Sequence, residues 1–203
     1  MKCDILLAGV GGQGVLTAAA LIAGAAVQEG LWVKQSEVHG MAQRGGSVSA
    51  HLRISDEPIF SDLIPRGMAK LLIAAEPLEA LRYLDYLAQD GALVSASEPL
   101  HNIPTYPEQA ELLAHIRSLG RALVVDAEKL AHQAGLPQAQ AIVLVGAATA
   151  FLPLRPAAIE EQIRRAFQAK PKHVVDANLL AFHAGLRASV EAHIPSEGGA
   201  PCL

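Results

Sequence analysis

Two stretches near the start of the sequence gather groups that could bind a small ligand. The first is AGVGGQGV, in which Gly9, Gly11 and Gly14 satisfy the spacing G-x-G-x-x-G. The second is SEVHGMAQRGGSV at 36–48, where hydrogen-bonding side chains stand among three glycines. Glycines let backbone N–H groups approach a phosphate closely, and the N-terminus of a following helix adds partial positive charge. Together the two stretches predict a ligand crevice rather than two simple connections.

The second stretch supplies the side chains for a polar or anionic ligand. Arg44 can pair with an anionic group through two parallel hydrogen bonds, and Gln43 and two serines can add neutral ones. His39 is either a proton donor or a hydrogen-bonding anchor, and Arg44 could instead pair with Glu37 to hold the loop. The candidate ligand-binding residues are Gly9, Val10, Gly11, Gly12, Gln13, Gly14, Ser36, Glu37, His39, Gln43, Arg44, Gly45, Gly46 and Ser47.

The same glycine pattern leaves two other functions open. In dinucleotide-binding proteins an acidic residue at the end of the second strand holds the ribose, and Glu37 lies 23 residues after Gly14, close to that spacing. A stand-alone NAD(P)-dependent oxidoreductase is therefore one alternative. The other is an assembly module without a ligand, in which the glycines only make a tight turn and let a helix pack closely.

The elements that would position these stretches alternate between strand and helix. An apolar run at 4–8 has strand length, the segment 13–29 indicates a buried helix, and LWVKQS indicates a second strand. In SVSAHLRIS apolar and polar residues alternate with a period of two, which predicts a half-buried strand. If the first two strands are neighbours, both loops lie at one crevice at the carboxyl ends of the strands.

The rest of the sequence continues this pattern and then becomes helical. Strands at AKLLIAAE, DGALVSAS and RALVVDA are separated by helices from Pro77 to about Ala88 and at 107–119, and helices follow from Asp126. We therefore predict a Rossmann-like, three-layer α/β fold with a mostly parallel or mixed central sheet and a helical C-terminal third. Residues 1–193 are expected to form a single domain and residues 194–203 a flexible tail.

Composition narrows the class of protein further. Of the 203 residues 51% are hydrophobic and 18% charged, which is ample for a core, and the net charge of −4 argues against a nucleic-acid binder. The apolar stretch 14–28 is alanine-rich and follows a glycine loop, as expected of a buried helix rather than a membrane span. Cys3 and Cys202 cannot hold an ordinary iron–sulfur cluster alone, and without a disulfide framework the chain suits a reducing cytoplasm.

The two stretches together carry a resemblance to a known family. GVGGQGV followed by SEVHGMAQRGGSVSAHLRIS closely resembles the gamma-type domain of 2-oxoacid:ferredoxin oxidoreductases, most of all the small beta subunit of the indolepyruvate-type enzymes. The specific matches cover 9–15 and 36–54, and the remainder is similar in element order and in IVLVGAATAFLPL. Such enzymes decarboxylate a 2-oxoacid on thiamine diphosphate, pass two electrons through iron–sulfur clusters to ferredoxin and release the acyl group on coenzyme A.

The resemblance implies a subunit without catalytic residues or a metal of its own. Thiamine diphosphate and the iron–sulfur clusters would belong to the large partner subunit, and this chain would help to bind coenzyme A and that subunit. The loop 11–14 carries over as the pyrophosphate or pantetheine contact, with Arg44 and its neighbours beside it. Relatives often have an Asn where Gln140 and Ala141 stand, so a ligand contact from that segment is in doubt.

The resemblance also sets the expected partners. Ferredoxin would be reached only indirectly, and neither nucleic acid nor a membrane is expected as a partner. The isolated chain would be free to dimerise through the face intended for the large subunit.

Overall fold

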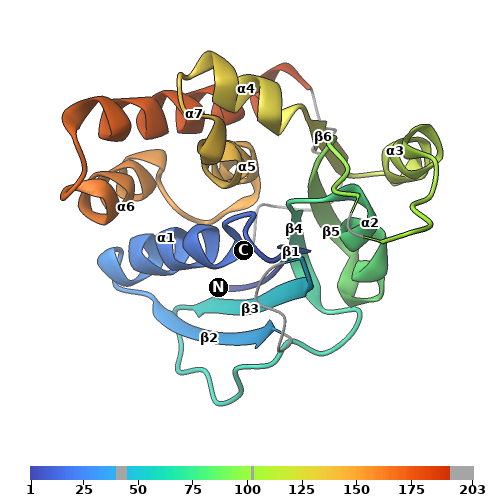
Figure 1. Ribbon diagram of the computed structural model, residues 1–203. Coiled ribbons are helices and arrows are strands. Elements are labelled where there is room, and N and C mark those ends of the chain that lie inside the picture. Colours follow the sequence, from blue (N-terminus) through green and yellow to red (C-terminus); the bar gives the residue numbers. More distant parts are fainter. Residues whose placement is uncertain (40–44, 102, 193–203) are drawn as a thin grey trace.

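The computed structural model describes residues 1–39, 45–101 and 103–192, which form a six-stranded sheet with helices on both faces (Figure 1). The strands are β1 (Lys2–Val10), β2 (Trp32–His39), β3 (Ser47–Ser55), β4 (Ala69–Ala74), β5 (Leu87–Ala96) and β6 (Ala122–Val125). The α-helices are α1 (Val15–Gln28), α2 (Pro77–Arg82), α3 (Gln109–Ser118), α4 (Ala127–Gln133), α5 (Gln140–Ala148), α6 (Pro156–Phe167) and α7 (Lys172–Glu191). The predicted fold class is confirmed, although α2 ends earlier than expected because Leu87 already begins β5.

The strand order is β2-β3-β1-β4-β5-β6, and only β3 runs against the others. The sheet is therefore mixed and mostly parallel. The first two strands are not neighbours, because β3 folds back antiparallel to β2 and takes the place beside β1. The register nevertheless pairs Val10 with Ser47 and His39 with Val48, so the ends of β1 and β2 and the start of β3 share one edge of the sheet.

The third strand is covered on both faces, which corrects the expectation of a half-buried strand. Arg53 is only 8% exposed and donates to both carboxylate oxygens of Asp4, at 2.8 and 3.1 Å. It also donates to the carbonyl oxygens of Ser61 and Leu63, both at 3.1 Å. Burial lowers the pKa of His51, whose Nδ1 accepts a hydrogen bond from the same loop at 3.1 Å. The loop between β3 and β4 thus covers the polar side chains of β3.

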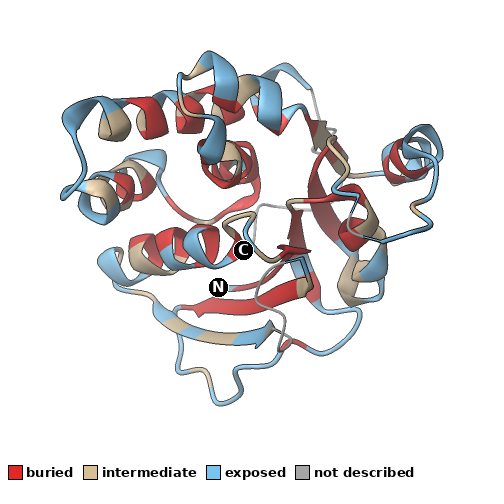
Figure 2. Cartoon of the chain, viewed as in Figure 1, coloured by how far each residue is buried: buried red, intermediate tan, exposed pale blue. Residues whose placement is uncertain are grey.

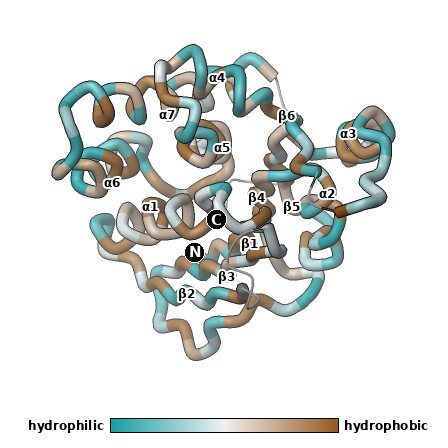
Figure 3. The backbone as a smooth tube through the Cα atoms, viewed as in Figure 1, coloured by the Kyte–Doolittle hydropathy of each residue, from teal (hydrophilic) through white to brown (hydrophobic). Residues whose placement is uncertain are grey.

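The helices divide between the two faces of the sheet. Helix α1 and the C-terminal helices bury their apolar residues against one face, and α2 and α3 cover the other (Figures 1 and 2). Helix α5 is buried along its whole length beneath α7, whereas the exposed helices alternate hydrophobic and hydrophilic residues (Figure 3). A Cβ on Gly146 would lie 2.0 Å from the carbonyl oxygen of Phe182, and one on Gly185 would lie 1.9 Å from that of Val143. Only glycines allow α5 and α7 to pack this closely.

Two further expectations concern the surroundings of the protein. No helix of the described residues is long and apolar enough to cross a membrane. Cys3 is fully buried in β1 and is disulfide-bonded.

Candidate functional site

The two sequence stretches meet through their backbones at the carboxyl end of β1. The N–H of Gly11 donates to the carbonyl oxygen of Gly46 at 2.8 Å, and the N–H of Gly45 donates back to Gly11 at 3.4 Å. The glycine loop and the end of the second stretch therefore meet at this edge of the sheet, although β2 is not the strand beside β1. The contact arises because β3, which begins one residue after Gly46, lies directly beside β1.

The glycine loop takes a conformation that other residues would adopt only with strain. Gly12 has φ +105° and Gly14 has φ +80°, both in the left-handed region. A Cβ on Gly14 would also lie 2.9 Å from the Cβ of Ala141 at the start of α5, while one on Gly12 would meet no atom within 4 Å. Gly14 is the N-cap of α1, and no side chain caps this end. The first-turn N–H groups of α1 are thus left for solvent or a ligand.

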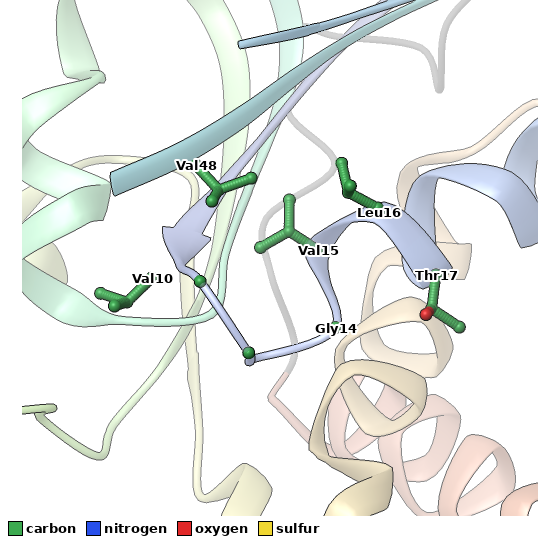
Figure 4. Close-up of a pocket in the computed structure, with 8 residues that line it drawn as sticks. Val10, Gly14, Val15, Leu16, Thr17 and Val48 are labelled. Carbon is green, nitrogen blue, oxygen red and sulfur yellow. The ribbon is translucent and has the colours of Figure 1, made fainter. Parts of the chain in front are cut away.

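A cavity of about 430 Å³ opens beside this loop (Figure 4). Its lining residues are Val10, Gly11, Gly12, Gly14, Val15, Leu16, Thr17 and Val48. The side chains of Val15 and Val48 point toward each other across it (Figure 4). Among the described lining residues only Thr17 has a polar side chain, so the walls are apolar and the polar groups are mainly those of the backbone.

Sequence reasoning missed the four side chains that form the walls of this cavity, which are Val15, Leu16, Thr17 and Val48. One signal was available: Leu16 stands at the start of an apolar helix directly after the glycine loop. In the structure its side chain is 36% exposed.

The side chain of Gln13 braces the loop from inside the protein. Its Oε1 accepts a hydrogen bond from the N–H of Val10 at 2.7 Å, and its Nε2 donates to the carbonyl oxygen of Ala75 at 3.1 Å. Gly9 leaves room for this arrangement, since a Cβ there would lie 3.0 Å from Gln13 Oε1 and 2.8 Å from Val15 Cγ2. Both residues shape the loop, and neither lines the cavity.

The other candidates are more scattered. The hydroxyl of Ser47 donates to Glu79 Oε2 at 2.5 Å and lies 3.2 Å from the Tyr83 hydroxyl, so it is engaged with α2 rather than with the cavity. Ser36 is half-buried on β2, and the exposed Glu37 accepts a hydrogen bond from Gln35 at 2.8 Å. Gln43 and Arg44 lie outside the described residues. Of His39 only the backbone position at the end of β2 is described.

The carboxyl ends of β4, β5 and β6 are acidic. Buried Glu76 accepts hydrogen bonds from the Tyr106 hydroxyl and from a backbone N–H of α2, and burial together with Glu76 raises the pKa of Tyr106. Burial and the neighbouring Asp126 raise the pKa of Glu98. An anionic ligand would be repelled here and favoured at the N-terminus of α1. No group of three His, Cys, Asp or Glu residues in the described part of the chain could hold a metal ion.

Comparison with known sequences identifies relatives over nearly the whole chain. The family described as pyruvate ferredoxin/flavodoxin oxidoreductase matches residues 4–188. "Indolepyruvate oxidoreductase subunit IorB" of Pyrococcus horikoshii is 38% identical over 198 residues, covering 93% of this chain and 96% of the relative. "2-oxoglutarate synthase subunit KorC" of Methanothermobacter thermautotrophicus is 30% identical over 191 residues, covering 91% and 94%.

Solved structures share the fold at lower identity. The gamma subunit of a keto/oxoacid ferredoxin oxidoreductase from Geobacter sulfurreducens aligns with TM-score 0.71 and 23% identity, over 95% of this chain and 98% of that one. A 2-oxoglutarate:ferredoxin oxidoreductase from Magnetococcus marinus, with 2-oxoglutarate, coenzyme A and succinyl-CoA bound, aligns with TM-score 0.78 and 19% identity. This alignment covers 98% of this chain but 33% of that longer chain.

Proposed function

Since this chain belongs to the pyruvate ferredoxin/flavodoxin oxidoreductase family and is a subunit of a 2-oxoacid:ferredoxin oxidoreductase, we propose that its enzyme acts on indolepyruvate or another aryl pyruvate. The IorB relatives support this substrate class, because they match at 35–38% identity against 30% for the 2-oxoglutarate synthase subunits. The enzyme would release the acyl group on coenzyme A and reduce ferredoxin. Residues 1–193 would form the single gamma-type domain, with 194–203 as a tail.

Within that enzyme we propose that this chain helps to bind coenzyme A in the cavity beside the glycine loop. The observation that carries the proposal is the junction of Gly11 with Gly46, which places an uncapped helix N-terminus beside an apolar cavity. The walls suit the pantetheine arm, whose amides need backbone partners and whose chain is otherwise apolar. The diphosphate is better matched by the N-terminus of α1, with Arg44 as the proposed cationic partner.

The subunit's contribution to the reaction would be positional. Holding the thiol of coenzyme A near the acyl–thiamine intermediate converts an encounter between two molecules into a reaction within one complex. Thiamine diphosphate supplies the decarboxylation chemistry, and iron–sulfur clusters carry the electrons; both are proposed to reside in the large subunit. Gly9 and Gln13 would then serve by fixing the shape of the loop, while Gly11, Gly12, Gly14 and Thr17 face the ligand.

The strand order weighs against the NAD(P)-dependent alternative. In a dinucleotide fold the acidic residue that holds the ribose ends the strand next to β1. Here β3 lies between β1 and the strand that carries Glu37, so Glu37 is one strand farther from the glycine loop. The ligand-free assembly module remains the second candidate. It predicts that a side chain can fill the cavity without weakening the binding of coenzyme A to the enzyme.

The test uses the complex reconstituted with its large subunit. Leu16 is partly exposed at the start of α1, so Leu16→Trp should fill the cavity without disturbing the core. Val27→Trp is the matched control, because Val27 is exposed at the opposite end of the same helix. We expect Leu16→Trp to raise KM for coenzyme A about tenfold, the loss of about 1.4 kcal/mol of binding, while KM for the 2-oxoacid and the control stay unchanged.

A second variant and a second ligand separate the alternatives. Arg44→Ala should weaken coenzyme A binding in calorimetric titration without weakening subunit association. The assembly module would be favoured if Arg44→Ala weakened subunit association and left coenzyme A binding unchanged, and if Leu16→Trp left KM for coenzyme A unchanged. Selective binding of NAD+ or NADP+ by the chain would restore the dehydrogenase alternative.

A further inference from the structure

Strand β2 is a free edge of the sheet that carries exposed apolar side chains. Strand β2 is drawn largely in the colours of exposed and intermediate residues (Figure 2), and Trp32 and Val38 are 55% and 54% exposed. The described part of the chain shows no backbone hydrogen bond to β2 other than those from β3. Phe60 is 93% exposed, and its carbonyl oxygen accepts a hydrogen bond from Lys34 of β2 at 3.3 Å. A free edge with apolar side chains is a template for pairing with another strand.

The exposed apolar residues lie on one face of β2. Successive side chains of a strand point to opposite faces, so Trp32, Lys34 and Val38 share a face. Val33 points the other way and packs against the core beneath α1. The loop that carries Phe60 lies on the face of Lys34. These three apolar side chains, Trp32, Val38 and Phe60, define the β2 patch.

The sequence of β2 is complementary to itself in one antiparallel register. A two-fold axis perpendicular to the sheet keeps each face on its own side, so only residues of the same face can stand opposite each other. With the axis at Gln35, each Trp32 stands opposite Val38 of the second copy, and Lys34 stands opposite Ser36. Shifting the axis to Ser36 would instead set Lys34 opposite Val38 and Trp32 opposite position 40, beyond the end of β2.

We propose that two copies of this chain pair through β2, antiparallel about Gln35, and so join their sheets into one continuous sheet. The proposal goes beyond the proposed function and does not depend on it. Alternate residues of the paired strands exchange two bonds each, giving about six to eight ladder hydrogen bonds. Aromatic residues opposite β-branched ones add about 0.2–1 kcal/mol per pair.

The loop that carries Phe60 is held in place before any second copy binds. The buried guanidinium of Arg53 is anchored by Asp4 and fixes the carbonyl oxygens of Ser61 and Leu63. Phe60 is therefore presented beside Lys34, close to the proposed axis, without a large entropic cost on association. The β2 patches of both copies would bury one another on the same face.

The first experiment measures the mass of the full chain in solution by light scattering at several concentrations. We expect a species of twice 21.3 kDa, and we expect Val38→Lys to raise the dimer dissociation constant at least tenfold. Val190→Lys changes the same residue type at a more exposed position on α7 (69% against 54%) and should leave the dimer unchanged. A monomeric wild-type chain, or equal effects of both variants, would overturn the proposal.

A cross-linking experiment tests the register and needs no destabilising change. Gln35→Cys places a thiol opposite itself, where Cβ atoms about 4.5–5.5 Å apart can form a disulfide after a small shift. Ser36→Cys faces Lys34 in this register, so it should not cross-link, and the wild-type chain controls for its own cysteines. Cross-linking of Ser36→Cys alone would refute the register.

The same cross-link decides whether β2 serves a different partner. In the reconstituted enzyme Gln35→Cys should still link two copies of this chain. If the large subunit abolishes the link, the edge belongs to that subunit and the proposal fails, while the proposed function stands. Gln35→Cys is not expected to change KM for coenzyme A, which separates this test from that of the cavity.

Discussion

Replacing Gln13 tests whether its side chain braces the glycine loop or contacts a ligand. Gln13→Ala removes hydrogen bonds of 2.7 Å from the Val10 N–H and 3.1 Å to the Ala75 carbonyl. Each is worth about 1 kcal/mol net, and the buried N–H of Val10 left without a partner costs about 1–3 kcal/mol. We therefore expect the free energy of unfolding to fall by about 2–4 kcal/mol. Urea unfolding followed by circular dichroism measures this, with the exposed Gln133→Ala as control.

Gln13→Glu adds a pH dependence whose sign follows from the same two contacts. The carboxylate can still accept from Val10, but it cannot donate to the Ala75 carbonyl and faces it with like partial charge. The protonated acid restores the donor, so the folded protein raises the pKa of this group. The variant's stability relative to wild type is then greatest at low pH and lost as pH rises through that pKa. If Gln13→Ala were as stable as the wild type but bound coenzyme A more weakly, the structural role of Gln13 would be refuted and a direct ligand contact would be supported.

Three further predictions concern packing and titration. Gly185→Ala should lower the free energy of unfolding by about 3 kcal/mol, because its Cβ would lie 1.9 Å from a carbonyl oxygen of α5. Gly120→Ala is the control in the same urea assay and should be near neutral, because its Cβ would meet no atom within 4 Å. Since burial lowers the pKa of His51, the wild-type chain should lose stability as pH falls below about 6.5, and His51→Gln should flatten that slope in thermal scans. Because burial and Asp126 raise the pKa of Glu98, its protonated form stabilises the fold at low pH; Glu98→Gln should gain stability over wild type as pH rises through that pKa, and a constant difference across pH would contradict this.

The local parts of the fold could be predicted from the sequence because their signals are local. The apolar run, the glycine turn and the alanine-rich helix of the first 28 residues occur where the pattern placed them. The buried stripe of Ile159 and Ile163 likewise follows from helical spacing alone. Strand order is different, since β3 separates β1 from β2 through pairings that no periodicity encodes.

The polar face of β3 shows why alternation was an incomplete guide. Ser49, His51 and Arg53 alternate with apolar residues as if they faced water, yet all three are buried. The difference comes from Asp4 and from the following loop, which satisfy these groups inside the protein. A period of two identifies two faces, but it does not say whether water or another segment covers the polar one.

The two stretches that the sequence singled out meet in the structure, but the contacts of their side chains depend on distant partners. Gln13 bonds to Ala75, 62 residues away, and Ser47 bonds to Glu79, 32 residues away. Neither contact has a signal in either stretch. Val48 is a buried residue of the core, and its place next to the turn at Gly46 also brings it to the cavity wall.

The glycine loop and the free edge place different demands on the same three strands. The loop must keep its shape when a ligand arrives, so its bonds to Gly46 and Ala75 tie β1 to β3 on one side and to β4 on the other. The edge can pair with another strand only if β2 stays flat against β3, and their eight-residue register provides this. Strand β3 supports both features, because it starts at the cavity and pairs with β2 along its length. Disturbing the ion pair of Arg53 with Asp4 should therefore weaken the pairing of β2 between two copies before it alters the cavity. Arg53→Lys would therefore lower dimer affinity while KM for coenzyme A changes little, and the reverse order would show that the cavity depends on the loop beneath β3.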